Sequence, residues 1–383
     1  MNQGIVLGQL LKLLPRREFE LLARQFHVGQ DFRQTSRWDQ CVALITAQVA
    51  GHHSLREIDA SGQAMRRRLA LIDSRPINRS SLSRVNAQQP WQLYERLFHM
   101  LLERCQRFQG HRKLPIDRKI LSLDSSTILL SLTLFPWARY RFQKGAVKLH
   151  VGLDHATWLP EFVCVTEGHW HDHQILAKIE PKAGVVYVFD RGYYDFAWYQ
   201  RLSAAGSVFV TRPKRTLLCE VLEERPTAKG SGVRRDQVIR LTGVQGKKHP
   251  GPLRRVFYTD PVTGKDLAFL TNNLDWTADT IAAIYKERWQ IELFFKWLKQ
   301  HARIKTFIGT SENALMTQIW VALVTYLMVA FLRLSHRLSS SLTHLLRLLR
   351  VALFDRRSLA ELIHAPPPAR PQKSVSQLEL SLA

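Results

Sequence analysis

The pattern of apolar and polar positions predicts helices in the first part of the chain. Up to about residue 110, apolar stretches of helical length alternate with short polar or proline-containing breaks. We expect helices over the ranges 5–14, 17–26, 38–50, 62–71 and 90–109. Residues 1–110 are therefore predicted to form an α-helical N-terminal region.

The polar break at 75–90, "RPINRSSLSRVNAQQP", has the composition of a further short helix. Its serines suit a helix N-cap, and Leu82 and Val85 would face inward. Four polar side chains would then project outward: Arg79, Ser81, Arg84 and Asn86. The second helix of a helix-turn-helix presents side chains to a DNA groove in this way. An ordinary capped surface helix is the alternative.

From residue 120 the pattern changes to strands separated by helices. Strands are expected at 120–124, 127–134, 146–154, 159–168, 185–189 and 208–214, with helical segments at 171–179 and 194–205. The run from Val185 to Phe189 is apolar throughout, which is typical of a strand buried on both faces. Residues 213–275 hold short alternating stretches between turns and predict a small β-rich insertion. Together these elements predict a mixed α/β sheet.

A helix expected over 285–300, "YKERWQIELFFKWLKQ", is apolar around most of its circumference. At about 100° per residue, Arg288, Glu292, Lys296 and Lys299 fall in one narrow polar stripe. The stripe is either a solvated face with an ion pair between Arg288 and Glu292, or the wall of a polar site.

The long apolar run at 314–334 is interrupted by Thr317, Gln318 and Thr325. A buried core helix is therefore expected rather than a membrane span. Residues 336–383 are expected to form a C-terminal helix and a proline-rich, disordered tail.

The charge of the chain favours a polyanionic partner. The 383 residues include 55 Lys and Arg against 32 Asp and Glu, which gives a formal net charge of +23. The basic residues form no juxtamembrane cluster, so nucleic acid is favoured over an anionic membrane surface. The four cysteines form no CxxC pair, so neither a zinc site nor a disulfide framework is indicated, and a reducing cytoplasm fits best. The N-terminus does not resemble a signal peptide.

Three carboxylates stand out as candidate metal ligands. Asp124 lies at an apolar strand, Asp190 ends the buried strand, and Glu292 lies in the polar stripe. Converging carboxylates repel unless a cation lies between them, and oxygen donors suit Mg²⁺ or Mn²⁺. Two such ions can activate an attacking water or 3′-hydroxyl and stabilise the leaving oxygen of a phosphodiester. Taken singly, Asp124 could instead be a strand-end turn and Asp190 a helix N-cap. The cluster "HWHDH" at 169–173 is interpreted as a polar helix start rather than a metal site.

The order of these residues resembles a known family. Asp124 in "LDSST", Asp190 in "DRGYYD" and the spacing Y-x2-R-x3-E-x6-K, which starts at Tyr285, are similar to the DDE transposases of the insertion sequence 4 family. The resemblance covers about 115–335. It implies an RNase H-like catalytic core interrupted by a β-rich insertion, behind an N-terminal DNA-binding domain. The expected division is 1–110, 111–212, 213–275, 276–335 and 336–383.

The resemblance also implies roles for single residues. Asp124, Asp190 and Glu292 would be catalytic and would hold two Mg²⁺ ions, for which Mn²⁺ could substitute. Tyr285, Arg288 and Lys299 would contact DNA phosphates near the scissile bond. Lys296 lies outside the motif and is a further phosphate contact or a charge partner.

The family's reaction implies partners and a location. A cut-and-paste transposase binds terminal inverted repeats and target DNA, cleaves the element ends and joins them to the target, as a homodimer on double-stranded DNA. The expected location is the bacterial cytoplasm, at the nucleoid when DNA is bound, without a membrane. The alternatives are a catalytically silent DNA-binding relative and a nuclease that cuts without joining.

One departure from the family concerns a tryptophan. Known members close the element end as a hairpin and stack a flipped base on a tryptophan of the insertion. The corresponding strand here reads "DLAFLTNN", with Phe269 and no tryptophan. We expect Phe269 to take the stacking role and the nearby Trp276 to pack at the start of a helix.

Overall fold

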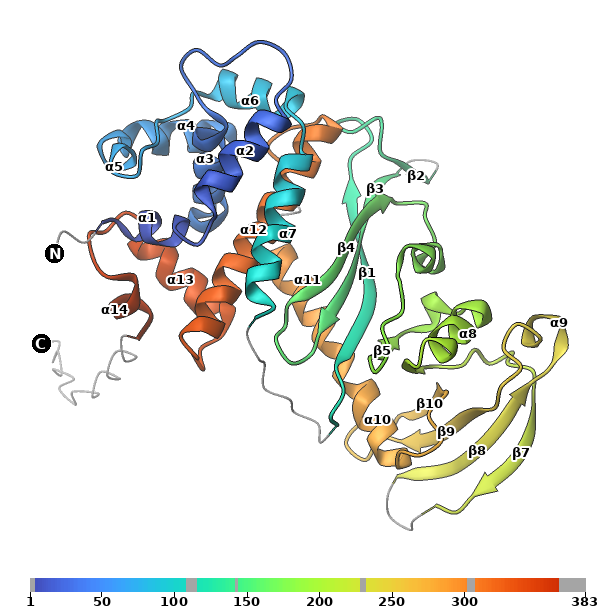
Figure 1. The fold of residues 1–383 in the computed structure, drawn as a ribbon. Helices are drawn as coiled ribbons and strands as arrows, with labels where there is room; N and C mark the ends of the chain where they lie inside the picture. The colour runs from blue at the N-terminus through green and yellow to red at the C-terminus, as the bar shows by residue number, and fades with distance from the viewer. Residues whose placement is uncertain (1–3, 108–115, 142–143, 228–231, 302–306, 365–383) are drawn as a thin grey trace, which may run out of the picture.

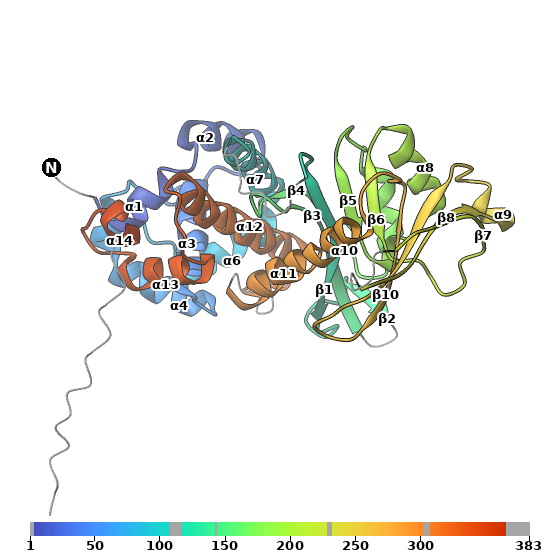
Figure 2. The ribbon, with the colours of Figure 1, turned by 90° about the horizontal axis from the view of Figure 1, so that it is seen from below.

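Two parts pack side by side in the molecule, one made of helices and one built around a large sheet (Figures 1 and 2). The computed structural model describes residues 4–107, 116–141, 144–227, 232–301 and 307–364. The two ends of the described chain meet in the helical part, where the Val6 amide donates to the Asp355 carbonyl oxygen (3.0 Å).

The N-terminal region is helical, as predicted. Its helices are α1 (Val6–Leu11), α2 (Arg16–Gln25), α3 (Arg37–Ala50), α4 (Leu55–Ala64), α5 (Arg66–Ala70), α6 (Arg79–Gln88) and α7 (Gln92–Cys105). The helix predicted at 62–71 is divided at Met65, where α4 ends and α5 begins. The α3 helix starts at a capping box in which Ser36 and Asp39 satisfy each other's backbone amides.

The long apolar helix α12 (Glu312–Ser335) forms the centre of the helical part, as predicted for a core helix. It is the one described helix long and apolar enough to cross a membrane, and 94% of its most apolar window is buried in the protein. It packs against α3, α6, α7 and α13 (Leu342–Ala352). On its other side, Tyr326 packs against the rings of Phe294 and Trp297, with ring centroids 4.9 and 5.1 Å apart. The last described helix is α14 (Leu359–His364).

The sheet has mixed pairing. Its first strands are β1 (Ile120–Leu130), β2 (Arg139–Arg141), β3 (Lys144–Asp154), β4 (Pro160–Glu167), β5 (Val186–Phe189) and β6 (Val208–Thr211). The β4–β3–β1 pairs are antiparallel, whereas β1, β5 and β6 run parallel. Strand β1 is continuous where the sequence predicted two strands, because Ser125 and Ser126 keep their pairing with β3.

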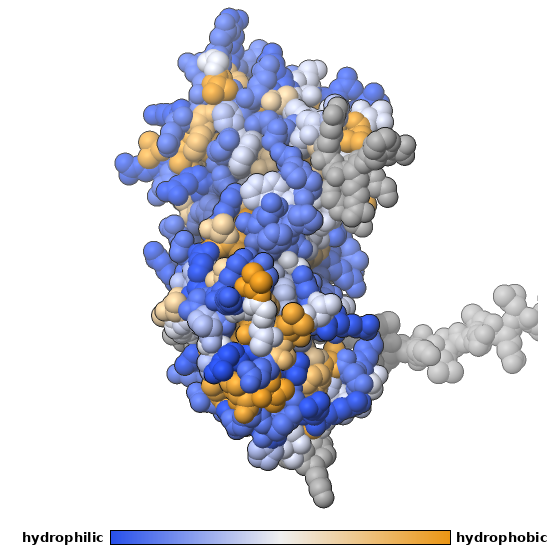
Figure 3. All heavy atoms as spheres, turned by 90° about the vertical axis from the view of Figure 1, so that its right-hand side faces the viewer, coloured by the Kyte–Doolittle hydropathy of each residue, from blue (hydrophilic) through white to orange (hydrophobic). Residues whose placement is uncertain are grey.

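Residues 213–275 extend this same sheet. They contribute β7 (Cys219–Arg225), β8 (Val233–Leu241), the short helix α9 (Gly243–Gly246), β9 (Leu253–Thr259) and β10 (Asp266–Thr271). The strands form an antiparallel meander, and β10 joins it to β6. Apolar patches are visible on this side of the molecule (Figure 3). The exposed apolar residues of the segment include Leu218, Val221, Leu222 and Val244.

Alternating residues of the parallel strands fill two apolar layers. Tyr187, Phe189 and Phe209 face the layer that contains α8 (Phe196–Ala204). Val188 and Val210 face the opposite layer, with α10 (Ala278–Glu287). These central strands are buried on both faces, as the apolar run predicted. Their carboxyl ends are thereby held in fixed positions.

Candidate active site

Asp124 and Asp190 lie on neighbouring parallel strands. The last paired residues of β1 and β5 are Leu123 and Phe189, and each aspartate follows directly. The Asp190 carboxylate accepts a hydrogen bond from the Gly192 amide (2.7 Å), so the predicted N-cap role is also present, at a short 3-10 helix η2 (Arg191–Tyr193). Asp124 lies within its strand rather than at a strand-end turn.

Arg288 joins the first and third carboxylates. Its guanidinium donates to Asp124 Oδ2 (3.3 Å) and to Glu292 Oε1 (2.5 Å). The sequence predicted one helix over 285–300, but the structure has two, α10 and α11 (Trp289–His301), which meet at Arg288. Hydrogen bonds three residues apart tighten this junction, from the Arg288 amide to Tyr285 O and from the Ile291 amide to Arg288 O. The ion pair between Arg288 and Glu292 that the sequence allowed is therefore present, and Arg288 extends it to Asp124 on the sheet.

The Asp124 carboxyl is held in an environment that disfavours its charge. Burial, followed by the nearby carboxylates of Asp190 and Glu292, raises its pKa from 3.8 to about 7. The Ser125 amide and Arg288 act in the opposite direction and do not cancel the effect. The Asp124 carboxyl therefore keeps its proton to a higher pH than a carboxyl at the surface does.

The donor chemistry fits a hard divalent cation. All three side chains offer carboxylate oxygens, the ligands that Mg²⁺ and Mn²⁺ prefer. Over the described residues, no three acidic, histidine or cysteine side chains stand close enough together to ligate an ion in this arrangement. The Arg288 guanidinium separates Asp124 from Glu292, so binding an ion between them requires that guanidinium to move.

A fourth carboxylate, Asp172, was not identified from the sequence. Its Oδ1 accepts hydrogen bonds from Ser125 Oγ (2.6 Å) and Lys148 Nζ (3.2 Å). His150 Nδ1 lies 4.0 Å from the same oxygen. Asp172 begins the 3-10 helix η1 (Asp172–Lys178), so the predicted polar helix start is present. The sequence signal was the "HWHDH" cluster itself, which gave no indication that it would lie beside Ser125.

Asp172 and Asp190 approach the same glycine from two sides. A β-carbon at Gly192 would lie 2.9 Å from Asp172 Oδ2 and 3.0 Å from Asp190 Oδ1. A side chain at this position would therefore displace the Asp172 carboxylate and crowd that of Asp190. Tyr193, which follows it, is buried, and burial together with the nearby acids raises its pKa.

The remaining motif residues lie along the same helices. Tyr285 is half-buried, its ring centroid lies 5.8 Å from the Arg288 guanidinium, and burial raises its pKa. On α11, Lys296 is exposed and Lys299 is half-buried.

The predicted stacking role of Phe269 is wrong. Its side chain is 1% exposed and belongs to the apolar layer beneath α10. The ring packs between Tyr258 and Tyr285, at centroid distances of 6.2 and 5.1 Å. A flipped base cannot reach it, because β10 is an interior strand. Trp276 packs against the same layer just before α10, in agreement with the packing role expected for it.

The predicted outward position of Asn86 is also wrong. Asn86 is 2% exposed, and its side-chain oxygen accepts a hydrogen bond from Gln40 Nε2 (2.6 Å). Arg79 and Arg84 are exposed, as expected for residues that would contact DNA. Asn86 lies on the buried face with Leu82 and Val85, so it is a structural residue of the helical core.

The chain is similar to transposases of insertion sequences. The family model described as Transposase DDE domain matches residues 115–328. A Sinorhizobium fredii protein assigned as transposase y4zB is 35% identical over 300 residues, covering 76% of this chain and 81% of that protein. A transposase assigned to insertion sequence element IS5377 of Geobacillus stearothermophilus is 30% identical over 258 residues, covering 66% of this chain and 67% of its own length.

The chain belongs to the DDE transposase family and is an insertion sequence transposase. A second family model, described as a domain of unknown function (DUF4372), matches residues 3–72. A structure of the piggyBac transposase synaptic complex with hairpin DNA covers 90% of this chain and 77% of its own chain, with a TM-score of 0.48 and 12% identity.

Proposed function

We propose that the chain catalyses cut-and-paste transposition of an insertion sequence 4-type element. The observation that carries the proposal is that Arg288 bridges Asp124 and Glu292, while Asp190 follows the parallel strand beside the one that carries Asp124. A transposase assigned to the element IS4SA of Synechocystis, 26% identical over 246 residues (63% of this chain and 68% of that protein), supports the choice of this family.

We propose that the catalytic core of the protein is RNase H-like. The strand order β4–β3–β1–β5–β6, antiparallel at first and then parallel, supports this choice. In our proposal 111–212 and 276–335 form this core, 213–275 is the β-rich insertion, 1–110 binds DNA, and 336–383 is the C-terminal segment.

The three carboxylates would hold two Mg²⁺ ions, or Mn²⁺ in their place. Such a pair of ions lowers the pKa of an attacking water and stabilises the leaving oxygen of a phosphodiester. Arg288 would then exchange its two carboxylates for a DNA phosphate, to which its planar fork is suited. Tyr285, Lys299 and Lys296 lie along the same two helices and would hold the DNA strand on either side of the scissile bond.

The partners in this proposal are the terminal inverted repeats and the target DNA. The net charge of +23 supports binding to a polyanion. Two element ends must be handled together, which calls for a homodimer on DNA. The site of action would be the bacterial cytoplasm, at the nucleoid.

Cleavage and joining assays on end-labelled DNA that carries the element's own ends test the proposal. The wild-type protein should nick the end with Mg²⁺ and join it to a target. Asp124→Asn, Asp190→Asn and Glu292→Gln should each remove cleavage and leave DNA binding intact or tighter, because a charge that faces phosphate is lost. The Glu287→Gln variant, on the same helices, is the control and should cleave normally.

Three outcomes would contradict the proposal. A triad variant that cuts at the wild-type rate would show that the acids are not catalytic. A wild-type protein that binds without cutting would be a silent DNA-binding relative. Cutting without joining would indicate a nuclease.

A further inference from the structure

A polar cleft of about 1190 Å³ lies in the N-terminal region, away from the carboxylates. One wall is the loop 28–35, and the other runs from the end of α4 through α5 to α6. In Figure 1 these helices lie at the opposite end of the molecule from β7–β10.

Buried polar contacts hold both walls in place. Gln89, which is 5% exposed, accepts a hydrogen bond from the Val28 amide (3.3 Å) and donates to the Val28 carbonyl (2.7 Å). Asp39, also 5% exposed, accepts from Ser74 Oγ (3.0 Å) and from the Arg75 amide (2.7 Å). The first pair fastens the loop to the end of α6, and the second fastens the chain before α6 to α3. The cleft is therefore preformed.

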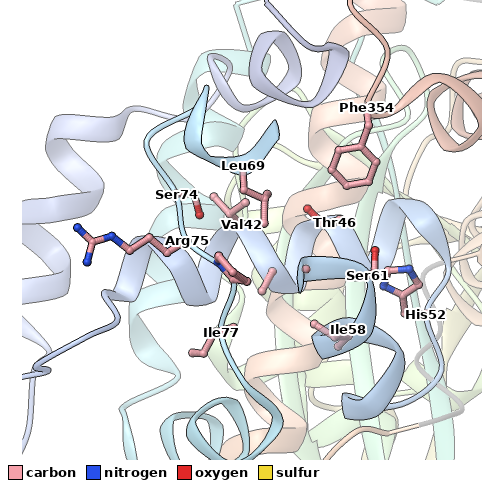
Figure 4. Close-up of a pocket in the computed structure, with 13 residues that line it drawn as sticks. Val42, Thr46, His52, Ile58, Ser61, Leu69, Ser74, Arg75, Ile77 and Phe354 are labelled. Carbon is pink, nitrogen blue, oxygen red and sulfur yellow. The ribbon is translucent and has the colours of Figure 1, made fainter. Parts of the chain in front are cut away.

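Apolar packing on the inner side of the second wall directs one arginine outward. Residues Val42, Leu69 and Ile77 line a small pocket behind this wall. Figure 4 shows the Arg75 side chain extending away from the pocket, while the apolar side chains gather around the pocket.

The cleft carries four exposed arginines: Arg33, Arg66, Arg75 and Arg84. Among the described residues, none of the four lies within ion-pair distance of an acid. The one acid in the lining, Asp31, lies 3.6 Å from His27 Nε2. Four guanidinium groups on a preformed surface without acidic partners favour an anionic ligand.

The α6 helix presents a polar stripe to the cleft. Ser81, Arg84 and Gln88 line it at spacings of three and four residues, the spacing of one helix face. Arg79 lies in a separate depression beside Arg56, and its amide donates to Asp59 Oδ2 (3.0 Å). The face available to a ligand is thus centred on Arg84 and includes Gln88, in place of the buried Asn86.

We infer that this cleft is a site for double-stranded DNA, which its four arginines hold by the phosphodiester backbone. The inference rests on the proposed function and gives a role to a segment, residues 3–72 with the adjoining α6, whose family model carries none. A guanidinium donates two parallel hydrogen bonds to a phosphate, so each of the four arginines can hold a phosphate of the DNA backbone. The carboxylate site then acts on DNA that is already held at a distance.

Salt-dependent binding of a labelled duplex to the full-length chain tests the inference. In the fourfold variant Arg33→Gln, Arg66→Gln, Arg75→Gln, Arg84→Gln, duplex affinity should fall. The slope of log K against log salt should become shallower by about 0.9 for each lost phosphate contact. The control removes the same charge from exposed arginines outside the cleft: Arg17→Gln, Arg24→Gln, Arg347→Gln and Arg356→Gln. It should keep a slope close to that of the wild type.

An equal loss in both fourfold variants would overturn the inference, because net charge alone would then explain binding. Unchanged binding in the cleft variant would overturn it as well. If the fourfold variant fails to fold, as judged by its thermal unfolding, the pairs Arg33→Gln, Arg66→Gln and Arg75→Gln, Arg84→Gln should each show about half of the slope change. A wild-type chain that binds duplex through the cleft but never cleaves would refute the proposed function and leave the inference standing. Normal cleavage and binding by the cleft variant would refute the inference and leave the proposed function standing.

Discussion

At the scale of single residues, Asp124 has the most unusual environment. Burial and two neighbouring acids raise its pKa to about 7 even though Arg288 is 3.3 Å away. The folded protein therefore holds this proton more tightly than the unfolded chain does. Stability contributed by the protonated form is present below about pH 4 and is lost as the pH rises to about 7.

Asp124→Asn should therefore raise the thermal unfolding temperature relative to wild type at pH 8, and the difference should disappear near pH 4. The variant cannot ionise, so it avoids the cost that wild type meets above pH 7. The rise from 3.8 to about 7 is about three pKa units at about 1.4 kcal/mol each, so a gain of up to about 4 kcal/mol is expected. Thermal unfolding in metal-free buffer from pH 4 to pH 8 measures this.

The matched control is Asp260→Asn, for which the difference in unfolding temperature from wild type should have the opposite sign. Amides of Val262 and Thr263 donate to the exposed Asp260 carboxylate and hold its pKa below the ordinary value. This substitution should give no gain at pH 8. An Asp124→Asn difference that stayed constant with pH would exclude the proposed environment of Asp124.

At the scale of elements, the junction of α10 and α11 decides how the site is arranged. The junction places one guanidinium against two carboxylates from different elements. Removing one partner of a buried ion pair leaves an uncompensated charge and costs about 3–5 kcal/mol. The Arg288 side chain is 17% exposed, so a cost near the lower end is expected.

Arg288→Ala should lower the unfolding temperature in metal-free buffer, and millimolar Mn²⁺ should restore more of it than in wild type. The reason is that the cation replaces the lost positive charge between Asp124 and Glu292. Lys286→Ala, an exposed change two residues earlier on α10, is the control and should show neither effect. Equal stabilisation of both variants by Mn²⁺ would contradict a role for Arg288 as the internal counter-charge.

The sequence predicted most elements, because their patterns are local. The helices of the N-terminal region, the core helix and the buried β5 strand follow directly from runs of apolar residues. The break at Arg288 could not be predicted, since no proline or glycine marks it and the Asp124 side chain that Arg288 contacts lies far away in the sequence. The Asn86 side chain points inward and bonds to Gln40, forty-six residues away, so its burial could not be predicted from the local sequence either.

The candidate site was partly predictable for the same reason. Asp190 follows an apolar strand and Glu292 interrupts an apolar helix, so each is conspicuous locally. Asp172 gained its place only through contacts with Ser125 and Lys148 on other strands. The burial of Phe269 follows from the pairing of β10 with β6, which joins the insertion to the central sheet. The catalytic and DNA-binding roles themselves stay predictions.

At the scale of the whole molecule, α12 connects the two parts. Asn313, at its start, donates to the Asn86 and Gln89 carbonyls at the end of α6 (2.9 and 2.6 Å). Tyr326, three turns later, contacts Phe294 on the helix that carries Glu292. Trp320 lies between them, stacked on Trp91.

A fragment that starts at residue 116 should be insoluble or aggregate when expressed alone. Without α3, α6 and α7, a large part of the apolar surface of α12 would be exposed to water, and a patch of this kind promotes association. Size-exclusion chromatography of fragment 116–364 beside the full chain measures this. A monomeric fragment with native unfolding cooperativity would show that the two parts are independent.

In the DNA-binding role proposed for α6, the position of α12 also limits how the DNA specificity of this enzyme can change. A transposase whose DNA-binding domain folds separately could acquire a new domain by recombination between genes. Here the inner faces of α6 and α7 are part of the surface that covers α12. A DNA-binding domain from another protein would therefore have to match that surface residue by residue. New specificity is therefore expected to arise by point substitutions on the exposed side of α6, where Arg84 and Gln88 can vary without disturbing the helix that anchors Glu292.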